Sequence, residues 1–350
     1  MCLYIILFLS ICFVYALLKI SIEQSRRREN VFLILSGILL FILYFFKSES
    51  VGSDYITYLN FFDDCYVDLD YLLKDDLAGF EKGYIILNKL IYMIYPNHLA
   101  FTFVLAVFFS WCSCFLIRRY VMPIWMGLFL LCTLSVFTNS FCLVRQSIAM
   151  YICWLSISSI LNRKLFKFLL IILVAFFFHK TALIFAPVYF LANYKLTNFS
   201  VMLGLLISFF IGEFIHQIMG LLTIYLQANN YLNDGNDGGF TKLLFLLLSF
   251  FCIYFLNVKS RYNDKSSNLF INMLFMMLSI QIISLNFSIL TRITDYFIIS
   301  LCVLFPKIIG LKMWNKHGAF VRVLFVIFFI FFFYYSNKSN SFGIIPYNIF

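Results

Sequence analysis

Charged residues are scarce in this chain of 350 residues. Only 12% are Asp, Glu, Lys or Arg, against about 25% in a typical soluble domain. This shortage excludes an ordinary soluble protein. A transmembrane β-barrel has strands of about ten residues that alternate apolar and polar side chains, and continuous apolar blocks such as Thr241–Val258 and Val321–Tyr335 exclude it. The sequence therefore predicts an all-α, polytopic transmembrane helical bundle of about 10–14 helices.

Patterns typical of metal sites and disulfide frameworks are also missing. The ten cysteines include no CxxC pair, and most lie in apolar runs, where Cys acts as a small hydrophobic residue. We therefore expect no disulfide framework, no metal and no cofactor. Residues Met1–Ile20 lack a charged start and a clear cleavage site, which favours a retained first helix over a signal peptide.

Apolar runs separated by charged or polar breaks are the expected membrane segments. These runs are 2–20, 31–46, 99–117, 122–138, 147–161, 166–178, 181–194, 199–216, 243–257, 269–286, 295–310 and 319–335. Segment Gly83–Pro96 is short and amphipathic and contains Lys89. We expect it to be an interfacial helix rather than a crossing.

The distribution of charge predicts the orientation in the membrane. One set of loops holds 17 of the 26 basic residues but only three of the 16 acidic ones. The positive-inside rule assigns these loops to the cytoplasm, so membrane orientation, rather than nucleic-acid binding, explains the net charge of +10. We expect one integral membrane domain over residues 1–350. Its extracytoplasmic loops are 47–98, which holds the interfacial helix, and 217–242.

Arg145, His179 and Lys180 fall on the predicted extracytoplasmic side, against the charge bias. An Arg presents a fixed fork of donors that suits phosphate; alternatively, Arg145 snorkels to lipid headgroups. His179 and Lys180 lie at the tip between two short apolar runs. They suit phosphate binding, and His179 also suits proton transfer near neutral pH. The alternative is a purely structural His.

Arg292 lies on the same predicted side, with Asp295 three residues and Tyr296 four residues further on. These spacings place all three side chains on one face of a helix. Arg292 is a second candidate for binding an anion, and Tyr296 for contacting a sugar. A salt bridge between Arg292 and Asp295 is the alternative.

A third motif, Gly52–Tyr58, follows the second apolar run. Gly52 permits a turn, after which Asp54, Tyr55 and Tyr58 project from the predicted outer segment. A carboxylate flanked by aromatic rings suits a sugar, because the rings stack on its apolar face and the carboxylate accepts from its hydroxyls. The alternative is an interfacial aromatic belt with Asp54 as a helix N-cap.

Taken in order, these motifs resemble the EpsG family of membrane polysaccharide polymerases, which overlaps the Wzy-type O-antigen polymerases. The resemblance covers nearly the whole chain. The motifs are Gly52–Tyr58, Glu81-Lys-Gly-Tyr84, Arg145-Gln-Ser-Ile-Ala149, Phe178-His-Lys-Thr-Ala-Leu183, Arg292–Phe297 and Ile345-Pro-Tyr347.

The resemblance implies a glycosyltransferase of the bacterial inner membrane, similar in architecture to GT-C enzymes, with its active site facing the periplasm. Such an enzyme joins oligosaccharide repeat units carried on undecaprenyl diphosphate, without an obligatory metal. A chain-length regulator protein is a further possible partner. A flippase for the same lipid-linked glycan and an O-antigen ligase are the alternative functions.

The chemistry of that reaction assigns hypothetical roles to the candidate residues. The leaving group is a lipid diphosphate, and without a metal its charge must be stabilised by side chains. Arg145, Arg292 and Lys180 are the candidates for this role. Asp54 and His179 are both candidates for the base, and the sequence does not choose between them. Tyr55, Tyr58 and Tyr296 are the candidates for sugar binding.

Overall fold

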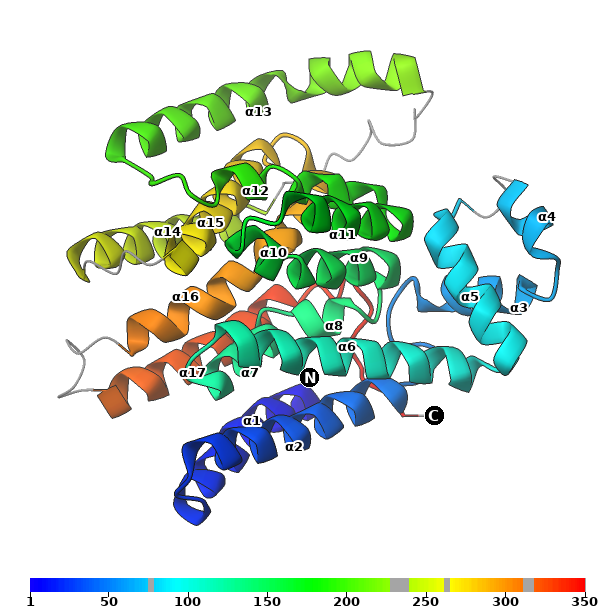
Figure 1. Cartoon of the computed structure of the whole chain (residues 1–350), viewed down its shortest axis with the longest axis horizontal. Helices are drawn as coiled ribbons and strands as arrows, with labels where there is room; N and C mark the ends of the chain where they lie inside the picture. The colour runs from blue at the N-terminus through cyan, green and yellow to red at the C-terminus, as the bar shows by residue number, and fades with distance from the viewer. Residues whose placement is uncertain (75–78, 227–238, 261–264, 311–317, 350) are drawn as a thin grey trace. The chain divides into compact units, whose positions relative to one another are not determined.

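The computed structural model describes residues 1–74, 79–226, 239–260, 265–310 and 318–349. The chain is 79% helical, and the described residues contain no β-strand (Figure 1). The predicted all-α fold class is therefore confirmed. Much of the predicted second loop, 217–242, lies outside the described residues.

Seven helical stretches of the described chain are long and apolar enough to cross a membrane, so the protein is a multi-pass membrane protein. They are Cys2–Ser21 (α1), Ser25–Phe45 (α2), His98–Tyr120 (α6), Val144–Leu161 (α9, Val144–Leu155, with α10, Ile157–Leu161), Asn198–Ile215 (in α13, Asn198–Leu226), Lys265–Ile283 (α15) and Gly318–Ser336 (α17).

Five apolar stretches are shorter. They are Ile124–Thr133 (α7), Leu165–Phe178 (α11), Lys180–Leu191 (η2, Lys180–Phe185, with α12, Val188–Leu191), Phe240–Leu256 (in α14, Phe240–Ser260) and Ile299–Ile309 (α16). The remaining helices are Tyr55–Asp64 (α3), Leu69–Lys74 (α4), Lys82–Ile94 (α5), Val136–Asn139 (α8) and the 3₁₀ helix Ser288–Phe297 (η4).

Several of the expected membrane segments are broken, and two of these breaks show why. Within run 122–138, Ser135 has a φ of 61° and separates α7 from α8. A left-handed residue cannot continue a right-handed helix, so this run is not one straight segment. Run 295–310 begins inside η4 and becomes α-helical only at Ile299. Hydropathy does not reveal either break, because the residues on both sides are apolar.

The chain divides into two compact units. The first contains residues 1–157, 169–183 and 309–350, and the second contains residues 158–168 and 184–308. In the first unit α2 packs along α6, and both α1 and α17 pack against α7. In the second unit α15 is central and contacts α12, α13, α14 and η4.

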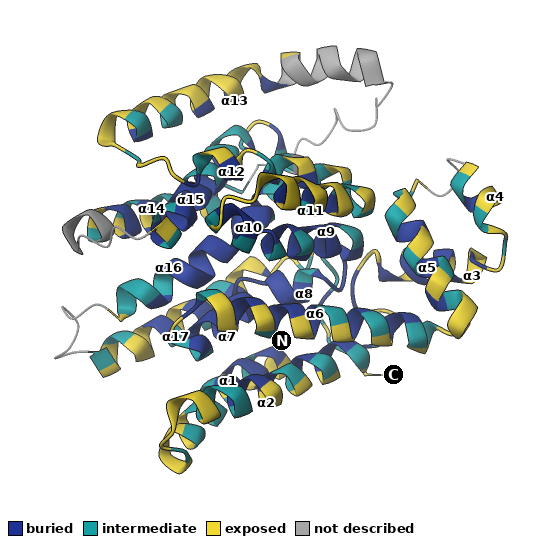
Figure 2. Ribbon diagram, in the orientation of Figure 1, coloured by how far each residue is buried: buried dark blue, intermediate teal, exposed yellow. Residues whose placement is uncertain are grey.

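Burial differs sharply among the membrane helices (Figure 2). The stretch Val144–Leu161 is 72% buried, whereas Gly318–Ser336 is only 17% buried although both are apolar. Large apolar side chains such as Phe320, Ile327 and Phe331 remain exposed on α17. An exposed apolar face of this extent on a membrane helix is suited to contact with lipid.

The C-terminal residues bind the loop between α2 and α3. The backbone N–H of Gly52 donates to the carbonyl of Gly343 at 2.9 Å, and that of Ser53 donates to Phe342 at 3.0 Å. The Tyr347 hydroxyl donates to the carbonyl of Leu43 at 2.7 Å. The closing motif Ile345–Tyr347 therefore helps to fix the segment that leads into α3.

Gly52 is the tightest point of this arrangement. Its φ is +104°, and a Cβ added there would lie 2.3 Å from the carbonyl oxygen of Phe141. We expect Gly52→Ala to destabilise the protein by about 1–3 kcal/mol through backbone strain alone, and by more through the clash. The measurement is the midpoint of thermal unfolding of the detergent-solubilised protein. Gly37→Ala is the control, since its Cβ would meet only the Cys114 sulfur at 3.3 Å; equal midpoints for the two variants would contradict this account.

Candidate active site

Glu81 lies between Arg145 and His179, two residues that the sequence predicts to be on the extracytoplasmic side of the membrane. Its Oε2 is 2.6 Å from Nη1 of Arg145, and its Oε1 is 2.7 Å from Nδ1 of His179. The backbone N–H of Lys180 also donates to Oε1, at 3.4 Å. The side chain of Glu81 is only 11% exposed. A single carboxylate thus brings together three segments that are far apart in the sequence.

A close backbone approach places Glu81 next to His179. Glu81 is the N-cap of α5, and Gly83 lies in the first turn of that helix. A Cβ on Gly83 would lie 2.7 Å from the carbonyl oxygen of Phe177, near the end of α11. Since glycine has no Cβ, the start of α5 can lie directly on this chain. His179 follows α11 immediately and is therefore within reach of Glu81.

Arg145 lies in the first turn of α9, where the helix dipole is positive and disfavours a cation. Glu81 offsets this, and Nη1 of Arg145 also donates to the carbonyl of Gly79 at 3.2 Å. The guanidinium lies 4.6 Å from the ring centre of Phe80 and 6.0 Å from that of Tyr58, within the range of a cation–π interaction. Its Nε is buried and has no partner among the described residues.

Glu81 is ionised over the whole physiological range. Burial alone would raise its pKa, but the hydrogen bond with His179 and the charge of Arg145 outweigh burial and lower the pKa to about 2. Tyr58 shows the opposite balance, because burial raises its pKa despite the nearby charge of Arg145. The site therefore contains a fixed negative charge, a neutral phenol, a cation and an imidazole.

A family model matches residues 30–349, which it describes as the EpsG family. The chain belongs to the EpsG family. Searches of curated proteins and of solved structures find no match. Family membership gives this EpsG protein a general role like that of a membrane polysaccharide polymerase. The matched region contains Glu81, Arg145 and His179.

The structure separates the two tyrosines of the Gly52–Tyr58 motif. Tyr58 lies near Arg145 and Phe80, whereas the ring of Tyr55 lies under Nζ of Lys47 and its hydroxyl is 2.7 Å from Oγ1 of Thr102. Both side chains are almost fully buried. Of the two, Tyr58 is the one positioned next to the cation of the EpsG site, and the sugar-binding role of either residue stays a prediction.

Asp54 is exposed and lies near the chain that leads into α9. Its Oδ1 accepts from Oγ of Ser53 at 3.2 Å, and Ser53 Oγ in turn lies 3.0 Å from Sγ of Cys142. No hydrogen bond or ion pair joins Asp54 to Arg145 or His179 among the described residues. The structure thus brings His179, but not Asp54, into the Glu81 cluster. Lys180 is exposed beside it.

Arg292 and Tyr296 are the candidate residues in the second unit. They flank Asp295 in the sequence, and Asp295 forms a different ion pair. Asp295 accepts from Nζ of Lys242 in α14 at 3.1 Å, and the same amine donates to the carbonyl of Thr291. Arg292 is exposed, and Tyr296 is fully buried. Lys242 was not anticipated as a partner of Asp295, because the two are distant in the sequence.

Sequence reasoning also missed Glu81 as a site residue. It was one of nine acidic residues in the segment 47–82, and nothing in its local composition distinguished it from the others. The available signal was its position in the motif Glu81–Tyr84, two residues before the glycine that packs on Phe177.

We expect Glu81→Gln to lower the midpoint of thermal unfolding at pH 7, because the neutral amide does not balance the charge of Arg145. The pKa of Glu81 is depressed in the folded protein, so its stabilisation is complete above the ordinary value of 4.5 and is lost as the pH falls towards about 2. The gap between wild type and variant should therefore close over that interval. Asp64→Asn, at an exposed carboxylate in α3, serves as the control; a gap that stays constant down to pH 2 would contradict the assignment.

Proposed function

We propose that this EpsG protein is a glycosyltransferase that joins oligosaccharide repeat units carried on undecaprenyl diphosphate. It acts at the periplasmic face of the bacterial inner membrane and belongs to the O-antigen and surface polysaccharide polymerases. The observation that carries the proposal is the cluster of Arg145, His179 and Glu81. All three residues fall on the side that the charge bias predicts to be extracytoplasmic.

In this reaction the diphosphate is the leaving group, and Arg145 stabilises the charge that develops on it. Its side chain is 22% exposed, and the positive end of α9 favours an anion at this position. Lys180 adds a second positive charge at the exposed rim. The diphosphate-binding role of Arg292, which lies in the second unit, stays a prediction. A preorganised donor of this kind contributes about 3–4 kcal/mol to the lowering of an activation barrier.

His179 is the better candidate for the base. When Nδ1 donates to Glu81, the lone pair of Nε2 is left to accept a proton, and the carboxylate stabilises the imidazolium that forms. The hydroxyl oxygen of the acceptor sugar attacks the anomeric carbon of the donor and loses its proton to Nε2. The bond from that carbon to the phosphate oxygen breaks, and the diphosphate leaves next to Arg145. Exposed Asp54 has no comparable partner to hold it in place.

We expect Arg145→Ala to reduce polymerisation by about 10²–10³-fold, in line with the loss of one preorganised donor. The measurement is the chain-length profile of surface polysaccharide in a strain that lacks its own copy, with protein level checked by immunoblot. Arg118→Ala, an exposed Arg at the predicted cytoplasmic end of α6, is the matched control. Long chains made by Arg145→Ala at normal protein level would refute the diphosphate role.

The same strain separates the alternative functions. A polymerase defect leaves single repeat units attached to the final acceptor. Loss of all periplasmic glycan indicates a flippase, and loss of attachment even of single units indicates a ligase.

A further inference from the structure

A cavity separate from the Glu81 cluster lies beside α3, on the side towards α6. Its volume is about 650 Å³, and it is lined by the loop after α2, the α3 helix, the α5–α6 connection and the start of α6. Unlike the surroundings of Arg145, its lining is polar and apolar in similar measure. None of the sequence motifs, apart from Tyr55, pointed to this cavity.

Three charged side chains form its mouth. His98 Nδ1 lies 2.8 Å from Oε1 of Glu49, and Nε2 lies 2.8 Å from Oδ1 of Asp63. An imidazole can donate to two carboxylates at once only in its protonated form. The other oxygen of each carboxylate has no hydrogen-bond partner in the described parts of the chain. These oxygens are more than half exposed at the level of the side chain, and they are available to accept.

The floor of the cavity is built around Lys47, which is 1% exposed. Its Nζ donates to the carbonyl of Val51 at 3.3 Å and lies 2.8 Å from the ring centre of Tyr55. Burial lowers the pKa of Lys47 well below its usual value. The hydroxyl pair of Tyr55 and Thr102 completes the floor. The amine and the two hydroxyls of the floor are therefore held in place by hydrogen bonds within the protein.

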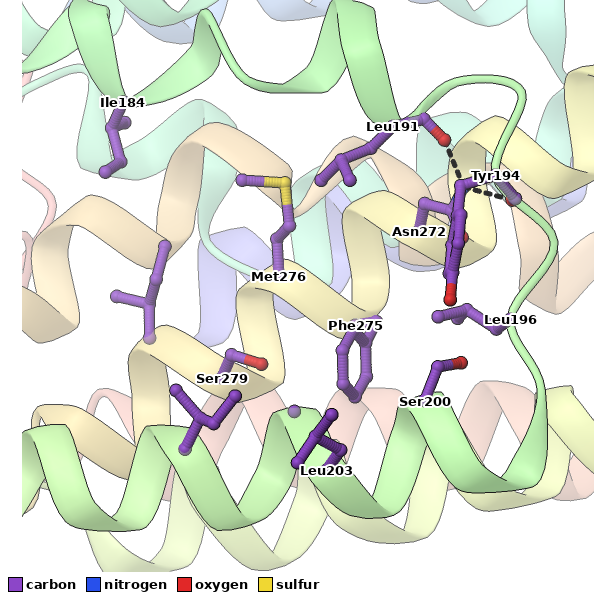
Figure 3. Close-up of a pocket in the computed structure, with 13 residues that line it drawn as sticks. Ile184, Leu191, Tyr194, Leu196, Ser200, Leu203, Asn272, Phe275, Met276 and Ser279 are labelled. Carbon is purple, nitrogen blue, oxygen red and sulfur yellow. Dashed lines mark hydrogen bonds between the residues drawn. The ribbon is translucent and has the colours of Figure 1, made fainter.

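The charges argue against a second diphosphate site here. His98 is already engaged by two carboxylates, which would also repel an anion at the mouth. A hydrocarbon chain is no better suited. A pocket of about 410 Å³ between α13 and α15 of the second unit has a very different lining from this cavity (Figure 3). That pocket is lined almost entirely by apolar groups such as Leu203, Phe275 and Met276.

From the carboxylate oxygens at the mouth, the hydroxyls of the floor and the apolar surfaces of Pro96 and Leu99, we infer that this cavity binds sugar rings of the glycan substrate. A sugar ring carries both hydroxyl groups, which donate to carboxylates, and C–H faces, which need an apolar surface. A pocket with a few convergent polar groups matches that combination. The inference rests on the proposed function, which supplies the glycan.

The α3 helix connects this cavity with the site around Glu81. Tyr55 and Tyr58 are three residues apart and are therefore neighbours on the helix surface. Tyr58 contacts Phe80 and lies near Arg145, while Tyr55 lines the cavity. The cavity and the Glu81 site therefore lie against neighbouring positions of one helix.

The test measures glycan binding directly on the full-length protein in detergent. The probes are oligosaccharides of one repeat and of several repeats, released from the host's own surface polysaccharide, and the method is isothermal titration calorimetry. Leu99→Trp places a large ring in the cavity without changing a charge, and we expect binding to weaken about tenfold or more. Ile94→Trp, at an 85% exposed position outside the lining, is the control and should bind as wild type does.

A second variant removes both carboxylate charges, and one acceptor oxygen from each side chain, without filling the cavity. Glu49→Gln combined with Asp63→Asn should weaken binding as well, with thermal unfolding used to select preparations that are folded. Unchanged binding by folded Leu99→Trp overturns the inference. Loss of binding only for the longer probe assigns the cavity to the growing chain, and equal loss for both probes assigns it to the terminal repeat that either substrate presents.

The outcome is independent of the polymerase assay. If wild type binds the oligosaccharides but restores no polymer to the deficient strain, the proposed function fails and the glycan site stands. If wild type makes polymer and Leu99→Trp binds and polymerises normally, the proposed function stands and the glycan site fails.

Discussion

The pairing of one buried carboxylate with a guanidinium and an imidazole is the interaction on which the site depends. A charge with little access to water is stable only when it is paired, and this holds for Glu81 as much as for its partners. Arg145 also faces the positive end of α9, so it has more need of a counter-charge than an Arg at a helix C-terminus. The ion pairs therefore tie the start of α5 to the start of α9 and the end of α11. Removing Glu81 or Arg145 leaves the other with an unbalanced charge, and removing His179 takes a hydrogen-bond partner from Glu81.

The fold class could be predicted, because the few charges exclude an ordinary soluble domain and the continuous apolar runs exclude a β-barrel. The positions of most helices followed from the same runs. The breaks did not, since Ser135 and the 3₁₀ helix η4 are set by packing and not by hydropathy. The same limit applies to the site. The charge bias selected Arg145 and His179, but the partner of both depends on the contact between Gly83 and Phe177, which local sequence cannot show.

The two tyrosines of α3 are neighbours on the helix but lie in different surroundings. Tyr58 is next to a cation, and Tyr55 belongs to a cavity whose mouth carries two carboxylates. A lipid-linked glycan has the same division, with its negative charge on the diphosphate and only hydroxyls and C–H faces on many of its sugars. The proposed sites thus differ in charge in the way that the two parts of this substrate differ. The C-terminal residues that bind Gly52 and Ser53 hold the approach to α3 and so affect both surroundings.

Glu81 has two partners, and this has a consequence for the proposed reaction. A diphosphate that approaches Arg145 competes with Glu81 for the guanidinium. As that ion pair weakens, the negative charge of Glu81 is balanced less by Arg145 and more by the imidazole of His179. In the proposed reaction, binding of the leaving group at Arg145 therefore leaves Glu81 paired chiefly with His179. Recognition of the donor is in this way joined to the positioning of the proposed base.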